Sequence, residues 1–200
     1  FSGLASSLAV LTPEQKEMGA LVIDMGAGTT EFVVYAGGVV RHTGVIAVGG
    51  QHVTNDLSFG LKVSTGRAED LKRRYGSAVY DGTVKGRTVC LDNDLGMSKK
   101  AVNLEHLHRI MYARIEETVQ LIDQQLDEEG LHDQIRAGVV ITGGGAKIPA
   151  ITNLAHDVFD LDATVGRADT MNGQKAILDE PENATAIGLV NYAAIRRKSQ

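Results

Sequence analysis

Residues 20–31 read ALVIDMGAGTTE, and the fold that we predict for the chain follows from this stretch. Its first four residues are apolar and indicate a buried strand, which is followed by an acid, Asp24. A loop of glycine and threonine then leads into a second β-rich run, FVVY. A carboxylate at the end of a buried strand costs free energy unless it has a partner or a ligand, so Asp24 is a candidate functional residue.

The residue types of this loop suit a nucleotide phosphate. Gly26 and Gly28 allow the backbone to approach a ligand closely or to adopt a positive φ, and Thr29 and Thr30 supply hydroxyl and amide donors. Asp24 is then predicted to hold a hydrated Mg²⁺ ion against the phosphates. The alternative is an ordinary hairpin, in which the glycines serve the turn and Asp24 accepts hydrogen bonds from the loop amides.

A second glycine cluster favours the nucleotide hypothesis. Residues 138–142, GVVIT, indicate another short buried strand, and Gly143, Gly144 and Gly145 follow it directly. Successive glycines leave a backbone surface without side chains, which an adenine ring or an α-phosphate can approach. The two units, a strand followed by DxGxGTT and a strand followed by TGGGA, resemble the paired signature of the actin, hexokinase and DnaK-type chaperone superfamily.

The segment after the first hairpin narrows this resemblance. Residues 41–76 read RHTGVIAVGGQHVTNDLSFGLKVSTGRAEDLKRRYG and resemble the pattern RHTxVIxxGGxHxTxDLxxGL followed by AExLKxxYG in FtsA, a family of bacterial cell-division actin homologues. VVITGGGAKIPAI and NATAIGLVNYA match the same family, whereas Ala27 and Glu31 depart from its usual DxGGGTTD loop. We therefore expect the chain to be a fragment, the second half of an FtsA-like protein without its N-terminal domain.

The resemblance implies an α/β fold, with an RNase H-like actin-type core sheet and a smaller inserted α/β lobe. We expect residues 1–60 and 103–200 to form the core subdomain and residues 61–102 to form the inserted one. The sheet should start with a hairpin over residues 19–48 and return near Gly138 and Thr164. Helices are predicted from apolar spacing at residues 1–11, 51–61, 64–75, 103–129, 149–159 and 184–197, and residues 12–14 should interrupt the first of them.

In the superfamily, the helix that corresponds to residues 64–75 reaches the nucleoside. This implies that Glu69 and Lys72 contact the ribose hydroxyls and the adenine. The alternative is a solvated charged face held by an ion pair between Glu69 and Arg73, which lie four residues apart.

Similarity to FtsA implies an ATP-binding scaffold of cell division that links FtsZ to the inner membrane and assembles at the septum. ATP and Mg²⁺ are the implied cofactors. FtsZ is expected to bind through the inserted lobe, and the protein is expected to self-associate into filaments. Peripheral contact with the cytoplasmic face of the membrane is expected only of the full-length protein. Because the chain carries half of the nucleotide cleft, we expect a weak ATPase at most in the full-length protein and no activity in the fragment. The alternatives are a fragment of a sugar-kinase-like or other ATPase of this superfamily, and a pilus-assembly actin homologue.

Composition bounds these hypotheses. With 200 residues, 43% of them hydrophobic, the chain can bury a real core. A net charge of −5 argues against nucleic acid as a partner, and no apolar run approaches the ~18 residues of a membrane span. The single cysteine, Cys90, has apolar neighbours, so we predict that it is buried, in keeping with a reducing cytoplasm.

Three further groups are interpreted as structural. Asp56 lies in the middle of a predicted helix and should make structural hydrogen bonds, the alternative being an acid near the cation. Residues 92–94 (DND) are predicted to form a turn, because the glycine and distal glutamate of an EF-hand are missing. His106 and His108 cannot share a helix face and have no cysteine companions, so they predict no metal site.

Overall fold

The computed structural model describes residues 1–80, 82–91, 100–168 and 178–198. Within these residues a five-stranded sheet has the order β3-β2-β1-β6-β7. The central strand β1 (Ala20–Met25) pairs antiparallel with β2 (Thr30–Ala36), which pairs antiparallel with β3 (Val39–Ile46). On its other side β1 runs parallel to β6 (Val139–Thr142), and β6 runs parallel to β7 (Ala163–Val165). The predicted hairpin-led sheet and its returning strands are confirmed.

Strand β1 is buried along its whole length because its two faces pack against different cores. Leu21 and Ile23 belong to the larger hydrophobic cluster, whereas Ala20 and Val22 belong to a smaller cluster on the opposite face. Full burial of a large aliphatic side chain contributes about 1.5–3 kcal/mol. A strand that is apolar on both faces is therefore held between two layers of helices.

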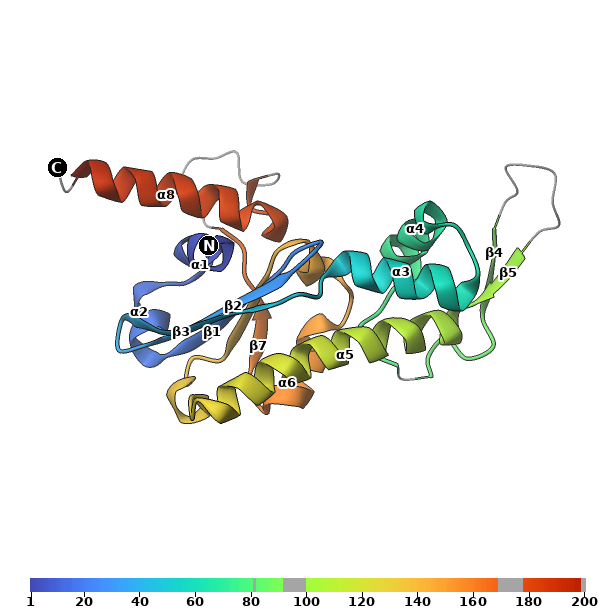
Figure 1. Cartoon of the computed structure of the whole chain (residues 1–200), viewed down its shortest axis with the longest axis horizontal. Helices are drawn as coiled ribbons and strands as arrows, with labels where there is room; N and C mark the ends of the chain where they lie inside the picture. The colour runs from blue at the N-terminus through green and yellow to red at the C-terminus, as the bar shows by residue number, and fades with distance from the viewer. Residues whose placement is uncertain (81, 92–99, 169–177, 199–200) are drawn as a thin grey trace.

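Helices cover both faces of this sheet (Figure 1). On one face lie α5 (Leu104–Glu128) and α6 (Ile151–Phe159), and on the other lies α1 (Ser2–Val10) with α8 (Ala184–Lys198) packed outside it. The predicted apolar stripe of α5 is buried as expected: Leu104, Leu107, Met111, Ile115, Val119, Ile122 and Leu126. Asn103 caps the start of this helix by accepting a hydrogen bond from the backbone N–H of His106 at 3.2 Å.

The remaining helices continue the first layer away from the sheet. Helix α3 (Gly50–Leu61) packs against α5, and α4 (Thr65–Tyr75) packs against α3. Beyond them β4 (Thr88–Leu91) and β5 (Lys100–Asn103) form a separate antiparallel pair at the end of the molecule opposite the C-terminus (Figure 1). One hydrophobic cluster runs from the sheet through Leu57 and Leu71 to Val102. The cluster crosses the predicted boundary between the core subdomain (residues 1–60 and 103–200) and the inserted subdomain (residues 61–102), so the division of the chain into these two subdomains remains a proposal.

Short elements differ from the prediction. Residues 12–14 do not merely interrupt the first helix: they begin α2 (Pro13–Met18), in which Pro13 occupies the first turn and Thr12 and Gln15 cap each other's backbone N–H groups. The described ranges also contain 3₁₀ helices at η1 (His132–Gln134), η2 (Gly144–Lys147) and η3 (Pro181–Asn183).

The prediction for Cys90 is wrong. Its side chain is exposed, because the β4–β5 pair alternates exposed and partly buried positions and Cys90 lies on the exposed face. The turn predicted at residues 92–94 lies outside the described residues. None of the helices in the described part of the chain combines the length and apolarity of a membrane span.

The contact between α1 and α8 gives a test of packing. A Cβ atom at Gly188 would overlap the carbonyl oxygen of Ala5. We expect Gly188→Ala to lower the free energy of unfolding by about 1–3 kcal/mol, because the two helices must separate. Gly66→Ala is the control, since a Cβ atom in α4 meets no atom within 4 Å at that position, and it should raise the free energy of unfolding by up to about 1 kcal/mol. Urea denaturation measures both variants, and an unchanged Gly188→Ala protein would contradict the argument.

Candidate functional site

The parallel pairing of β1 and β6 brings the two glycine loops together. Asp24 and Thr142 are partners in the register, so the loops that follow them leave the same edge of the sheet. Gly143 has φ 79°, and a Cβ atom there would lie 2.5 Å from Asp24 Oδ1 and 2.7 Å from the carbonyl oxygen of Met25. Glycine is thus required at this position both by conformation and by the close approach of the two loops.

Asp24 lies at the floor of this junction, with 8% of its surface exposed. The hydroxyl of Thr185, at the start of α8, donates a hydrogen bond to Asp24 Oδ2 at 2.9 Å. The second loop is held in turn by Pro181, whose carbonyl oxygen accepts a hydrogen bond from Gly143 N–H at 3.1 Å. Sequence reasoning did not single out Thr185, because its contact with Asp24 spans 161 residues and the only signal was its place in NATAIGLVNYA.

The first loop is docked on the start of α3. The carbonyl oxygens of Gly26 and Ala27 accept hydrogen bonds from the N–H groups of Gly50 and Gln51 at 2.9 and 2.8 Å. Neither Gly26 nor Gly28 has a positive φ, so these glycines are not needed for backbone conformation. The other predicted role, close approach of the backbone to a ligand, remains a prediction. At Gly28 a Cβ atom would meet nothing within 4 Å.

The two threonines of this loop differ. Thr29 is exposed at the tip. Thr30 is fully buried, and its hydroxyl donates a hydrogen bond to the carbonyl oxygen of Val48 at 2.8 Å. The Thr30 hydroxyl therefore has a structural role, because its hydrogen bond goes to the protein backbone.

The charged side chains of α4 form a network with α3. Lys72 Nζ lies 2.7 Å from Glu69 Oε2 and donates hydrogen bonds to Gly50 O at 2.9 Å and to Thr54 Oγ1 at 2.8 Å. Thr54 in turn donates a hydrogen bond to Glu69 Oε2 at 2.5 Å, and Arg73 Nε lies 2.8 Å from Glu69 Oε1. The Glu69–Arg73 ion pair that we considered as the structural alternative is therefore present. Glu69 and Lys72 also face a cavity, as a contact with the nucleoside would require.

The cavity has a volume of about 910 Å³, within the usual range for small-ligand sites. Its walls come from the first glycine loop, from the start of α3, from one side of α4, and from the second glycine loop with η3. The predicted residues that line it are Gly26, Glu69, Lys72, Gly144 and Gly145. The others lie outside the lining: Asp24 and Gly143 are buried where the two loops meet, Gly28 and Thr29 lie on the exposed tip, and Thr30 lies in the sheet.

A further cation at the rim was not predicted. Lys147 lines the cavity beside the glycines and pairs with Glu182 at 2.9 Å and with Glu180 at 3.2 Å.

Asp56 lies elsewhere, in an ion pair with Arg114 Nε at 2.6 Å, which confirms its structural interpretation.

The network makes the ionisation of Glu69 a measurable quantity. Partial burial would raise the pKa of this carboxyl, but hydrogen bonds from Lys72, Thr54 and Arg73 outweigh burial and lower the pKa from 4.5 to about 2. A carboxylate with a lowered pKa stabilises the fold above its unfolded-state pKa, and this stability is lost as the pH falls through the folded-state pKa.

We expect Glu69→Gln to lower the free energy of unfolding at pH 7 by about 1–2 kcal/mol. The difference from wild type should shrink as the pH falls from 4.5 towards 2, because the wild-type carboxyl then becomes protonated as well. Asp70→Asn removes the same charge from an exposed neighbour on α4 and should have a smaller effect. Denaturant unfolding across this pH range measures the three proteins, and a Glu69→Gln difference that does not change with pH would contradict the assignment.

Comparison with known proteins places this geometry in a family. The family model described as cell division protein FtsA matches residues 21–188. Cell division protein FtsA of Neisseria meningitidis serogroup B is 36% identical over 191 residues, which cover 95% of this chain and 46% of that protein. FtsA of Pseudomonas aeruginosa is 32% identical over 189 residues, which cover 94% of this chain and 45% of that protein. The chain thus spans about half the length of the curated relatives that it matches.

Among solved structures, MreB5 of Spiroplasma citri bound to ADP superposes with a TM-score of 0.78 at 20% identity, over 99% of this chain and 60% of that one. This likeness establishes the actin-like fold. The family match favours a cell-division protein over the sugar-kinase-like and pilus-assembly alternatives. On the strength of that match and of the fold, the chain belongs to the FtsA family of actin-type cell-division proteins.

Proposed function

We propose that this chain forms the second half of an ATP-binding cleft in an actin-like scaffold of cell division. The observation that carries the proposal is the meeting of two glycine loops at the ends of β1 and β6, where both loops contribute to the wall of a cavity of about 910 Å³. Side-chain-free backbone at both loops suits the close approach of phosphate and of a base. The ADP held by the related MreB5 fold supports a nucleotide as the ligand.

Each part of the cavity has a proposed role. Gly26 lines the cavity on the phosphate side, and Gly28 and Thr29, at the exposed tip of the same loop, are proposed to reach the phosphates from outside the lining. Gly144 and Gly145 line the nucleotide side, and the buried Gly143 supports them from below. Glu69 and Lys72 contact the nucleoside. Their mutual ion pair at 2.7 Å holds both side chains in position for this contact. Because its hydroxyl is buried, Thr30 contributes to the shape of the loop rather than to a ligand contact.

The residues present also fit Mg²⁺. This ion prefers carboxylate oxygens and keeps several of its waters, and Asp24 is a carboxylate held rigidly between the two loops. We propose that Asp24 holds Mg²⁺ through water and that Thr185 positions the carboxylate. When bound, Mg²⁺ supplies neutralisation of phosphate charge.

The chain supplies one side of this cleft. Phosphoryl transfer depends on groups that are positioned around the whole phosphate chain, so we propose that the full-length protein is a weak ATPase at most and that this segment alone is inactive. ATP binding then serves assembly: self-association into filaments at the septum, on the cytoplasmic face of the inner membrane.

We propose that FtsZ is the partner and that it binds through residues 61–102. Directly before this segment, and outside it, Phe59 at the end of α3 is 89% exposed, so we propose that the surface that binds FtsZ also includes the end of α3. Phe59 lines a shallow hollow of about 660 Å³ together with Ser58, Gly60 and Lys62. An exposed aromatic side chain beside a hollow is typical of a residue that anchors a protein interface.

Nucleotide binding tests the cleft. In the full-length protein, Lys72→Ala should weaken ATP binding at least tenfold, because it removes a cation that is tied to the cavity wall by Gly50 and Thr54. Arg74→Ala removes an exposed cation of the same helix and should change the affinity less than twofold. Calorimetric titration with ATP and Mg²⁺ measures both variants, and equal affinities for Lys72→Ala and wild type would exclude Lys72 from the site.

Sedimentation tests the scaffold function. The full-length protein should pellet FtsZ with vesicles of inner-membrane lipid, to a greater extent with ATP than without nucleotide. Phe59→Ser should reduce the pelleted FtsZ several-fold, whereas Val45→Ser, at a 52% exposed position of the edge strand β3, should not. Absence of FtsZ from the pellet, together with steady ATP turnover on a small substrate, would overturn the scaffold proposal.

A further inference from the structure

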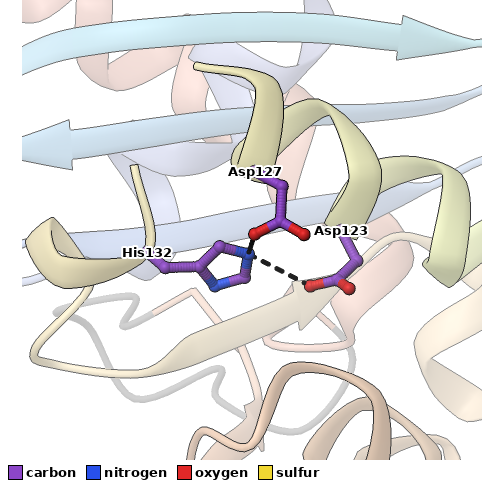
Figure 2. A group of neighbouring side chains, drawn as sticks. All are labelled: Asp123, Asp127 and His132. Atoms are coloured by element: carbon purple, nitrogen blue, oxygen red, sulfur yellow. Dashed lines mark ion pairs between the residues drawn. The ribbon is translucent and has the colours of Figure 1, made fainter. Parts of the chain in front are cut away.

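We propose that Asp123, Asp127 and His132 form a binding site for a divalent transition-metal ion of the Zn²⁺ class. The two aspartates lie four residues apart on the last turns of α5, so they share one face of the helix. His132 begins η1 just after the end of that helix. Its ring points between the two carboxylates (Figure 2).

The separations of the three side chains are compatible with ligands of one ion. His132 Nε2 lies 3.2 Å from Asp123 Oδ1 and 3.2 Å from Asp127 Oδ1, and all three ligand atoms lie within 4.8 Å of one another. Two atoms bound tetrahedrally to Zn²⁺ at about 2.0–2.1 Å are about 3.3 Å apart. The distance from His132 Nε2 to each aspartate oxygen is therefore close to the distance between two ligands of one Zn²⁺ ion.

The backbone around the cluster is held in place. Gly130, with φ 63°, turns the chain back at the end of α5, and Leu131 N–H donates a hydrogen bond to Leu126 O at 2.9 Å. Leu126, Leu131 and Ile135 are buried in the main core. The histidine is thus presented from a fixed turn, which lowers the entropic cost of gathering the three ligands.

The local charge favours a cation. Asp123 and Asp127 bring two carboxylates to one face of the helix end. The carbonyl groups at the C-terminus of α5 add negative potential at the same place. Within the described ranges, the ion pairs of Asp123 and Asp127 are those with His132. A divalent ion would neutralise both carboxylates.

The ligand set indicates the class of metal. One imidazole nitrogen and two carboxylate oxygens suit Zn²⁺, Co²⁺ and Ni²⁺, whereas Ca²⁺ and Mg²⁺ prefer oxygen alone. Asp123 and His132 are 28% and 30% exposed and Asp127 is 73% exposed, so an ion can reach the cluster and water can complete its shell. Such a site would clamp the turn after α5 to the helix.

Calorimetric titration of this chain with Zn²⁺ and with Co²⁺ tests the proposal, in a Cys90→Ser background that removes the exposed thiol. We expect one ion per chain with a dissociation constant on the order of micromolar. His132→Gln and Asp123→Asn should each weaken binding at least tenfold. Asp133→Asn is the matched control, since it removes an exposed neighbouring charge outside the cluster and should change the affinity less than threefold.

Thermal unfolding gives a second measurement that is independent of the nucleotide cleft. Zn²⁺ should raise the Tm of the parent and of Asp133→Asn relative to EDTA, and should raise the Tm of His132→Gln by less. Circular dichroism checks that each variant is folded. No binding by the parent below millimolar metal, or equal binding by parent and His132→Gln, would overturn the proposal and leave the cluster as an ion pair.

Discussion

The parallel pairing of β1 with β6 is the constraint on which the rest of the site depends. Its register sets Asp24 beside Thr142, so both following loops begin at the same height on one edge of the sheet. Side chains alternate along a strand, so a shift of one residue would turn Asp24 to the opposite face. The close approach at Gly143 and its hydrogen bond to Pro181 exist only in this register.

The opposite wall of the cavity depends on a different kind of interaction. Helices α3 and α4 are joined at the cavity by a cluster of charged and hydroxyl groups rather than by apolar contact alone. Removing one member of such a network leaves the others without partners in a partly buried place, which is why it fixes the helices relative to each other. A wall built in this way has its polar groups in position before any ligand arrives, and this lowers the cost of binding.

The fold was predictable from the sequence because its elements have strong local signals. The hairpin and the long apolar stripe of α5 both follow from spacing and residue type. Helix α2 was missed because Pro13 indicates an interruption as readily as a first helical position, and only the capping by Gln15 distinguishes the two. Cys90 was misplaced because its apolar neighbours could not reveal that β4 belongs to a two-stranded sheet with an exposed face.

The site was predictable in part. The glycine loops and α4 carry motifs, and the structure brings Gly26, Glu69 and Gly144 to one cavity. Thr185 lies in a family-matched stretch that does not reveal its role, and His132 carries no motif, because the roles of both arise from contacts with residues that are distant in the sequence or lie across a turn. The burial of Thr30 was equally hidden, since the same hydroxyl that suits a phosphate also suits the carbonyl of Val48.

The hydrogen bond between Thr185 and Asp24 has a thermodynamic consequence. Thr185 lies in the first turn of α8, and α8 lies across α1 on the outer layer of the fold. A ligand that draws the Asp24 carboxylate away from Thr185 loses a bond of about 1 kcal/mol, and a contact that shifts α8 removes the same bond from Asp24. Binding at the floor of the cleft and the position of the outermost helix are therefore coupled, and the coupling has the same magnitude in both directions.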